Sequence, residues 1–138
     1  MPLQRLKTRP QFQAVLAGFI VSKTDHFALH RNRLDIEPVM AQKGNGSATR
    51  LLFRVQATWI GAVVPKRWAK RAVTRNLIKR QIYSVSDEFS QHCPLAAFVV
   101  RLRHGFARTE FVSASSAQLK YAVRTELRTL MREGLDAT

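Results

Sequence analysis

Apolar residues recur along this chain with two different spacings, and these spacings predict the order of its helices and strands. The first pattern repeats every three or four positions, as on one face of a helix, at Phe12, Val15, Leu16 and Phe19. Thr8 can cap this helix, Gln11 can complete a capping box, and Pro10 is tolerated in the first turn. The pattern therefore predicts a short helix that begins after Thr8 and ends near Gly18.

Three stretches further along have the patterns of strands. Residues 26–31 alternate between apolar and polar positions, and residues 51–64 are rich in Val, Phe, Trp and Ile until Pro65 ends the run. Residues 96–103 have an apolar core and a basic end. Between the last two strands, the segment that follows Pro65 is expected to be a helix that reaches about Val85.

A closing helix is predicted from one apolar stripe with helical spacing, formed by Leu119, Val123, Leu127 and Leu130. The predicted order is α-β-β-(β)-α-β-α, where the bracketed strand is a further short one. This order indicates a single α+β domain over residues 1–138, in which three helices pack in two layers on a central sheet of three or four strands. Residues 42–49 have the composition of a mobile loop, and residues 134–138 are expected to be a frayed tail.

Composition sets limits on where the protein acts. An apolar fraction of 46% is that of a globular chain, and Cys93 is the only cysteine, which favours a reducing, cytoplasmic setting. No apolar run reaches the roughly 18–20 residues that span a bilayer, and the N-terminal residues are polar and basic rather than those of a signal peptide. We therefore expect a cytoplasmic protein without a membrane partner.

Charge separates this chain from an ordinary globular protein. It has 23 Lys and Arg against 9 Asp and Glu, a formal net charge of +14. No acid occurs between Glu37 and Asp87, although that interval contains ten Lys or Arg. Such an excess disfavours self-association, so the protein alone is expected to be monomeric, and it attracts polyanions, of which nucleic acid comes first and an anionic membrane second.

The excess is concentrated at residues 70–80, KRAVTRNLIKR. On a helix, Arg71, Arg75 and Lys79 form one stripe whose turns are ~5.4 Å apart, a spacing comparable to that of phosphates along a strand. The candidate nucleic-acid-binding residues of this motif are Lys66, Arg67, Lys70, Arg71, Arg75, Asn76, Lys79 and Arg80. A membrane-surface helix is less favoured because its apolar side suits core packing, and a helix-turn-helix is less favoured because strands flank the segment.

No other residues have the pattern of a catalytic or metal site. His26 and His30 would lie ~13 Å apart on a strand, too far to bind one ion together. The acids Asp35, Glu37, Asp87 and Glu88 have no neighbouring histidine, so we expect no catalytic side chain and a partner that supplies the reactive centre. Aromatic residues such as Phe12 and Phe27 fit either a core or a platform on which single-stranded bases stack.

At residues 75–80, RNLIKR, the chain resembles the bacterial ribonuclease P protein component. That family's signature is an Arg-Asn pair followed three and four residues later by Lys-Arg, on a helix that follows a strand ending in basic residues. The lead-in VVPKR at residues 63–67 and the opening RLKTRPQF at residues 5–12 are similar too, so the resemblance spans nearly the whole chain.

The resemblance implies a small basic subunit that binds a large catalytic RNA and the 5′ leader of precursor tRNA, and so promotes endonucleolytic removal of the leader. Hydrolysis is expected from the RNA and Mg²⁺ that it holds, with no organic cofactor; a protein ligand to metal remains undetermined. By position, the leader cleft is expected to consist of Phe12, Leu16, Phe27 and His30. The family also implies a left-handed crossover between parallel strands. A general RNA-binding structural protein, such as a ribosomal component, is the alternative.

Four positions depart from the family pattern. Leu77 and Tyr83 stand where Arg is frequent, and Leu16 and His30 stand at positions that are often aromatic. The resemblance therefore implies fewer cationic contacts on the helix and a less aromatic cleft than is usual.

Overall fold

The computed structural model describes residues 3–35, 53, 57–106 and 117–136 of the 138-residue chain. These residues form five strands, three α-helices and one short 3-10 helix. In chain order they are β1 (Gln4–Arg5), α1 (Arg9–Leu16), β2 (Phe19–Lys23), β3 (Phe27–Asn32), β4 (Trp59–Val63), α2 (Ala72–Glu88), η2 (Ser90–His92), β5 (Ala97–Leu102) and α3 (Ala117–Asp136). The predicted α+β class and the three helices are confirmed. The loop expected at residues 42–49 lies outside the described residues.

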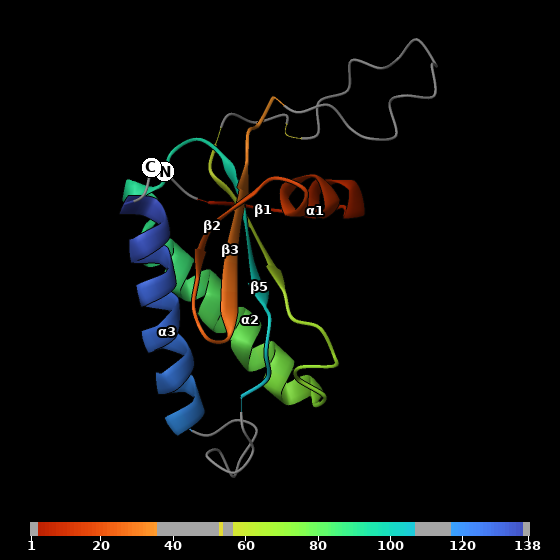
Figure 1. Ribbon diagram of the computed structural model, residues 1–138, viewed down its shortest axis with the longest axis vertical. Coiled ribbons are helices and arrows are strands. Elements are labelled where there is room, and N and C mark those ends of the chain that lie inside the picture. Colours follow the sequence, from red (N-terminus) through yellow and green to blue (C-terminus); the bar gives the residue numbers. More distant parts are fainter. Residues whose placement is uncertain (1–2, 36–52, 54–56, 107–116, 137–138) are drawn as a thin grey trace.

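The strands form a single mixed sheet in the order β1-β4-β5-β3-β2 (Figure 1). β1, β4 and β5 are parallel, whereas β3 pairs antiparallel with both β5 and β2. β4 and β5 are parallel neighbours connected through α2, as the resemblance implies, and the hand of this crossover stays a prediction. The sheet contains one strand more than the upper number expected, because β1 is only two residues long and has no pattern of its own.

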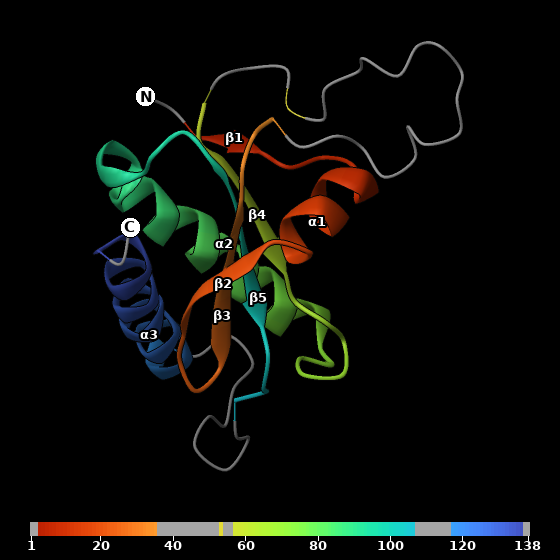
Figure 2. The same cartoon turned by 45° about the horizontal axis from the view of Figure 1, so that its top comes forward.

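Helices cover both faces of the sheet. Figure 2 shows α1 on one side of the strands and α2 with α3 on the other. Two apolar clusters correspond to these faces: one contains Phe27 and Leu29 with α2 and α3, and the other contains Val15 of α1 with Trp59 and Val99. The expected two-layer packing therefore describes α2 and α3, and α1 adds a partial third layer.

α3 closes the larger cluster as its pattern predicts. The four stripe residues Leu119, Val123, Leu127 and Leu130 are all buried. The helix continues to Asp136, and Gly134 is buried against Leu29 and Val21, so the frayed tail expected from residue 134 is wrong for residues 134–136. Residues 137–138 lie outside the described part of the chain. Among the described residues, no helix is long and apolar enough to cross a membrane.

α1 begins with the predicted capping box. Thr8 Oγ1 accepts a hydrogen bond from the Gln11 backbone N–H, and Gln11 Oε1 accepts bonds from the N–H groups of Thr8 and Lys7. The helix ends at Leu16, earlier than expected, and Phe19 starts β2 with 74% of its surface exposed. Phe19 is therefore not part of the apolar face of this helix.

The approach of α1 to the sheet depends on Gly61 in β4. A Cβ atom at this position would lie 2.5 Å from Cε1 of Phe12 and 2.8 Å from Cδ1 of Leu6. Both distances are far below van der Waals contact, so α1 and the segment that leads into it can lie this close only because residue 61 has no side chain.

Substitution of Gly61 by Ala is expected to lower the free energy of unfolding by about 1–3 kcal/mol, because the added methyl group overpacks the contact with Phe12. Urea denaturation of the two proteins measures the difference. In the double variant Gly61→Ala/Phe12→Ala, the methyl group meets no ring, so its cost should be smaller than in the single variant. An equal cost in both backgrounds would contradict this account.

Candidate nucleic-acid interface

The first four cationic residues of the predicted motif lie before α2 rather than on it. The chain turns directly after β4, where the carbonyl oxygen of Pro65 accepts hydrogen bonds from the N–H groups of Trp68 and Ala69. α2 then begins at Ala72, with Arg71 in an extended conformation as its N-cap. The expectation that the helix starts just after Pro65 is wrong: one turn follows Pro65, the chain then becomes extended at Arg71, and helical hydrogen bonding begins with the bond from Arg75 N to the Arg71 carbonyl oxygen. Lys66, Arg67, Lys70 and Arg71 are exposed on the turn.

The other four residues of the motif lie on α2 as predicted. Asn76, Lys79 and Arg80 are exposed, whereas Leu77 and Ile78 between them are buried in the core. The eight residues therefore lie on the turn and on the first half of the helix, and we call them the basic segment. Its members are Lys66, Arg67, Lys70, Arg71, Arg75, Asn76, Lys79 and Arg80.

Arg75 differs from the rest of the basic segment because it is half-buried and holds the turn. Its Nη1 donates hydrogen bonds to the carbonyl oxygens of Ala69, at 3.0 Å, and Lys70, at 2.8 Å. This guanidinium group therefore has a structural role in addition to its charge, so its replacement would disturb the position of Lys70 and Arg71.

In the described part of the chain, carboxylates form ion pairs away from the basic segment. Glu88, at the end of α2, pairs with Arg124 and Arg128 of α3. The hydrogen bond from Arg128, together with the charges of both arginines, lowers the pKa of the Glu88 carboxyl below its ordinary value. Glu126 of α3 accepts hydrogen bonds from Thr24 and from the backbone of His26, and lies 2.7 Å from His26 Nδ1. The acids thus fix α3 to α2 and to the turn between β2 and β3.

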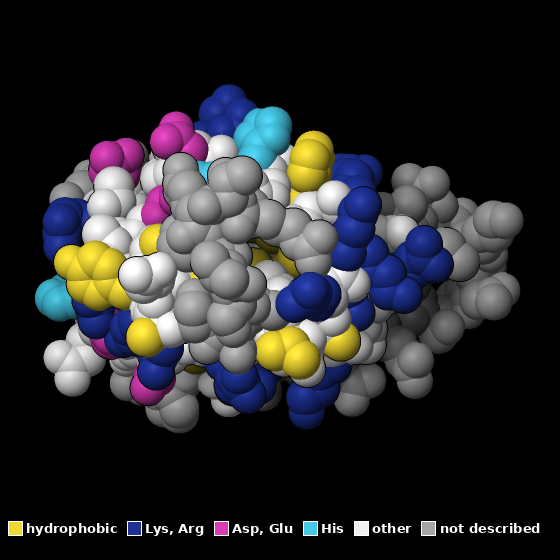
Figure 3. All heavy atoms as spheres, turned by 90° about the horizontal axis from the view of Figure 1, so that it is seen from below, with side chains coloured by type: hydrophobic (Ala, Val, Ile, Leu, Met, Phe, Trp, Pro, Cys, Tyr) yellow, Lys and Arg dark blue, Asp and Glu magenta, His cyan; other side chains and the backbone are white. Residues whose placement is uncertain are grey.

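The described ion pairs leave out every cation of the basic segment. Figure 3 shows the end of the molecule where β4 and α2 are connected, and its right-hand half carries dark-blue Lys and Arg side chains with no magenta carboxylate among them. Cations without neutralising partners repel one another and attract phosphate groups, so this surface suits a polyanion.

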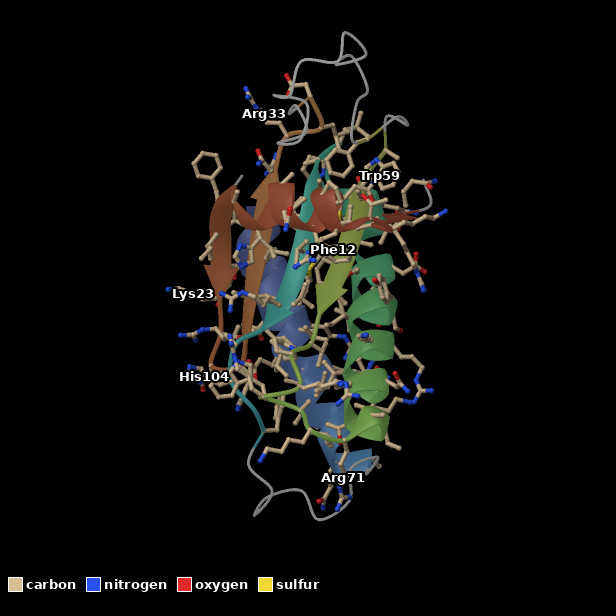
Figure 4. All side chains as sticks on the ribbon, turned by 90° about the vertical axis from the view of Figure 1, so that its right-hand side faces the viewer. Phe12, Lys23, Arg33, Trp59, Arg71 and His104 are labelled. Carbon is tan, nitrogen blue, oxygen red and sulfur yellow. The ribbon has the colours of Figure 1, made fainter. Side chains whose placement is uncertain are left out.

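The second candidate surface is the face of the sheet that α1 covers only in part. Figure 4 looks onto this face: α1 crosses the strands, Phe12 points from it onto the sheet, and no described helix covers the strands below it. Phe12 and Leu16 are half-buried, so both keep solvent-facing surface at the edge of α1. Lys23 projects from the edge strand β2 beside the uncovered part (Figure 4).

Phe27 is the one predicted cleft residue that does not belong to this surface. Its side chain is 0% exposed and packs in the core cluster on the opposite face, with α2 and α3. Its placement on the cleft floor is therefore wrong. The alternation in β3 correctly puts Phe27 and Leu29 on one face, but that face is the one that α2 and α3 cover.

His30 does lie on the α1 face, where it is paired in register with Val99 of β5. Its side chain is 5% exposed, and its Nε2 accepts a hydrogen bond of 3.1 Å from Nε of Arg101. Burial, and after it the charge of Arg101, lowers the pKa of His30 below the ordinary value of 6.5. The neutral imidazole thus positions the Arg101 side chain through this hydrogen bond. We did not single out Arg101 from the sequence, where its only signal is the basic end of a strand.

A metal site is not formed by the described side chains. Among them, no group of three or more His, Cys, Asp or Glu residues could hold an ion.

Burial raises the pKa of the Cys93 thiol, which disfavours the reactive thiolate.

The lowered pKa of His30 predicts how stability changes with pH. As the pH falls below 6.5, the unfolded chain takes up a proton at this residue before the folded protein does, so the free energy of unfolding decreases. In a His30→Gln variant this contribution is absent, and its stability should decrease less than that of the original protein between pH 7 and pH 5. Urea denaturation at both values measures the difference, and parallel profiles would contradict the prediction.

Comparisons with known proteins place the chain in a family. The family model described as Ribonuclease P matches residues 2–131. The ribonuclease P protein components of Nostoc sp. (strain PCC 7120) and Trichormus variabilis are each 30% identical over 122 residues, which cover 84% of this chain and 78% of theirs.

Solved structures agree with the fold. The RNase P protein of Staphylococcus aureus superimposes with a TM-score of 0.62 and 17% identity, over 93% of this chain and 92% of that one. The RNase P protein of Thermotoga maritima does so with a TM-score of 0.58 and 19% identity, over 94% and 96%. The family match over nearly the whole length, together with this fold and its basic segment, shows that the chain belongs to the ribonuclease P protein family.

Proposed function

We propose that this ribonuclease P subunit binds two RNA chains at the same time. The basic segment binds the catalytic RNA, and the partly covered face between α1 and the sheet binds the 5′ leader of precursor tRNA. The observation that carries the proposal is the basic segment itself, whose cations form none of the ion pairs within the described residues. The family match supports the subunit role and gives no support to the alternative of a general structural RNA-binding protein.

Binding to the catalytic RNA is driven by charge. Each cation that contacts a phosphate releases a condensed counterion, so affinity is expected to fall steeply as salt increases. Exposed Lys and Arg residues on a turn and on the next two helical turns present several such contacts in a row. The charge also reduces repulsion between the catalytic RNA and its RNA substrate.

Binding to the leader favours substrate over product. Mature tRNA has no leader, so any contact in the cleft strengthens binding of the precursor alone. Phe12 and Leu16 provide half-buried apolar surface at its upper wall, and Arg101 and Lys23 provide positive charge on its floor and edge. This combination of apolar platform and cationic groove is typical of sites for single-stranded nucleic acid.

Hydrolysis is assigned to the catalytic RNA and to Mg²⁺ that the RNA holds. The described carboxylates do not group into a metal site, and Glu88 and Glu126 are committed to contacts with α3 and with the hairpin. The protein's proposed contribution is binding and orientation in the cytoplasm, without an organic cofactor or a membrane partner.

Replacement of Lys79 and Arg80 by Gln should weaken binding to the catalytic RNA and lower the slope of log affinity against log salt by about 1.5–2, because two phosphate contacts are lost. Both side chains are exposed, so the fold should be retained. Arg75 is left unchanged because of its bonds to the turn. Filter binding at several salt concentrations is the measurement.

The matched control removes the same charge from α3, by Lys120→Gln and Arg132→Gln, both exposed. If the basic segment has a specific role, the Lys79/Arg80 variant loses more affinity for the catalytic RNA than this control does. Equal losses of affinity would mean that net charge alone matters. Unchanged affinity in both variants would reject the proposed interface.

Substitution of Phe12 by Leu keeps an apolar side chain against the sheet but removes the ring. If bases of the leader stack on Phe12, affinity for precursor tRNA should fall roughly 5- to 150-fold, since stacking of one base contributes ~1–3 kcal/mol. Affinity for mature tRNA should not change. Affinities of the assembled complex for precursor and mature tRNA are measured, and circular dichroism checks the fold. Equal losses of affinity for both tRNAs would show that Phe12 has only a structural role.

A further inference from the structure

A groove of about 680 Å³ lies between β1 and α2. Its base is Ile60 of β4, and its walls are mostly exposed polar side chains. It is lined by Leu3, Arg5, Ile60, Asn76, Lys79, Arg80, Tyr83, Ser84 and Asp87. The groove thus joins three residues of the basic segment, Asn76, Lys79 and Arg80, to the N-terminal strand.

Arg5 has a defined place in this groove. Its guanidinium carbon lies 4.0 Å from the centre of the Tyr83 ring, a cation–π contact between β1 and α2. The backbone that carries Arg5 is fixed as well, because Gln4 N donates to the carbonyl oxygen of Thr58 and Leu6 N to that of Ile60, at 2.9 and 3.0 Å. An arginine held in this way loses little conformational freedom when it binds a phosphate.

The charge of the groove selects its ligand. Arg5, Lys79 and Arg80 contribute three cations against the single carboxylate of Asp87. Asn76 adds an amide that can donate to and accept from a ribose or a base edge. A volume of this size is within the range of roughly 300–1,000 Å³ that accommodates a small organic ligand such as one nucleotide unit.

We propose that this groove binds a ribose-phosphate unit of the catalytic RNA, with Arg5 as a phosphate-binding residue and Tyr83 as the residue that positions it. The inference rests on the proposed function of the basic segment and extends it to β1. Phosphate contacts would then come from two elements on either side of the groove, so that an RNA strand is enclosed rather than touched along one helix.

Three variants test the two roles. Arg5→Gln should lower affinity for the catalytic RNA about tenfold and reduce the salt slope by roughly 0.7–0.9, the effect of one lost phosphate contact. Tyr83→Leu should lower affinity in the same direction, whereas Tyr83→Phe, which keeps the ring, should bind like the original protein. In the Arg5→Gln background, Tyr83→Leu should have no further effect on affinity, because the two residues act through one contact.

The control for charge is Arg132→Gln, a single exposed cation on α3, and thermal denaturation checks that each variant is folded. An unchanged salt slope in Arg5→Gln, or equal losses in Arg5→Gln and Arg132→Gln, would overturn the inference. So would an undiminished effect of Tyr83→Leu in the absence of Arg5. These results would leave the proposed function intact as long as the Lys79/Arg80 variant still loses affinity.

A second measurement identifies which RNA occupies the groove. At saturating catalytic RNA, so that assembly is complete, Arg5→Gln should bind precursor tRNA as tightly as the original protein does. A loss of precursor affinity under these conditions would assign the groove to the substrate instead and overturn the inference as stated.

Discussion

The cations of the basic segment repel one another, and the fold tolerates this repulsion because ion pairs and apolar packing elsewhere hold α2 and α3 on the sheet. Two of the described carboxylates pair with groups outside the segment: Glu88 with two arginines of α3, and Glu126 with His26 beside the β2–β3 turn. These pairs fasten α3 across one face of the sheet, and apolar packing beneath it keeps α2 in place. The cations of α2 can therefore remain unpaired without loss of the fold. A bound polyanion would relieve their repulsion, so RNA and folding should reinforce each other.

The sheet separates the two surfaces for which we propose RNA binding. On one face, α1 leaves part of the strands open beside Arg101; on the other side of β1, the groove opens towards α2. The two consecutive residues Arg5 and Leu6 connect these regions, because Arg5 contacts Tyr83 whereas Leu6 packs in the cluster under α1. The short strand β1 thus ties the entrance of α1 to the helix that carries the basic segment.

Patterns within the sequence predicted the elements well where local chemistry determines them. The capping box at Thr8 and the stripe of α3 are confirmed, since each depends on residues a few positions apart. Contacts between distant residues were not predictable in this way: β1 exists through pairing with β4, and Arg5 meets Tyr83 only in the folded chain. Phe27 was misplaced because helices cover both faces of the sheet, so apolar alternation does not say which face holds the cleft.

The absence of a side chain at Gly61 sets the distance between α1 and β4. In the proposed leader site, this contact also sets the distance between Phe12 and the strands, since Phe12 packs directly on this glycine. The space that the proposed site leaves for a nucleotide is therefore determined at a position that need not contact RNA itself. A substitution meant to widen or narrow the proposed site would therefore be made at residue 61 rather than at Phe12.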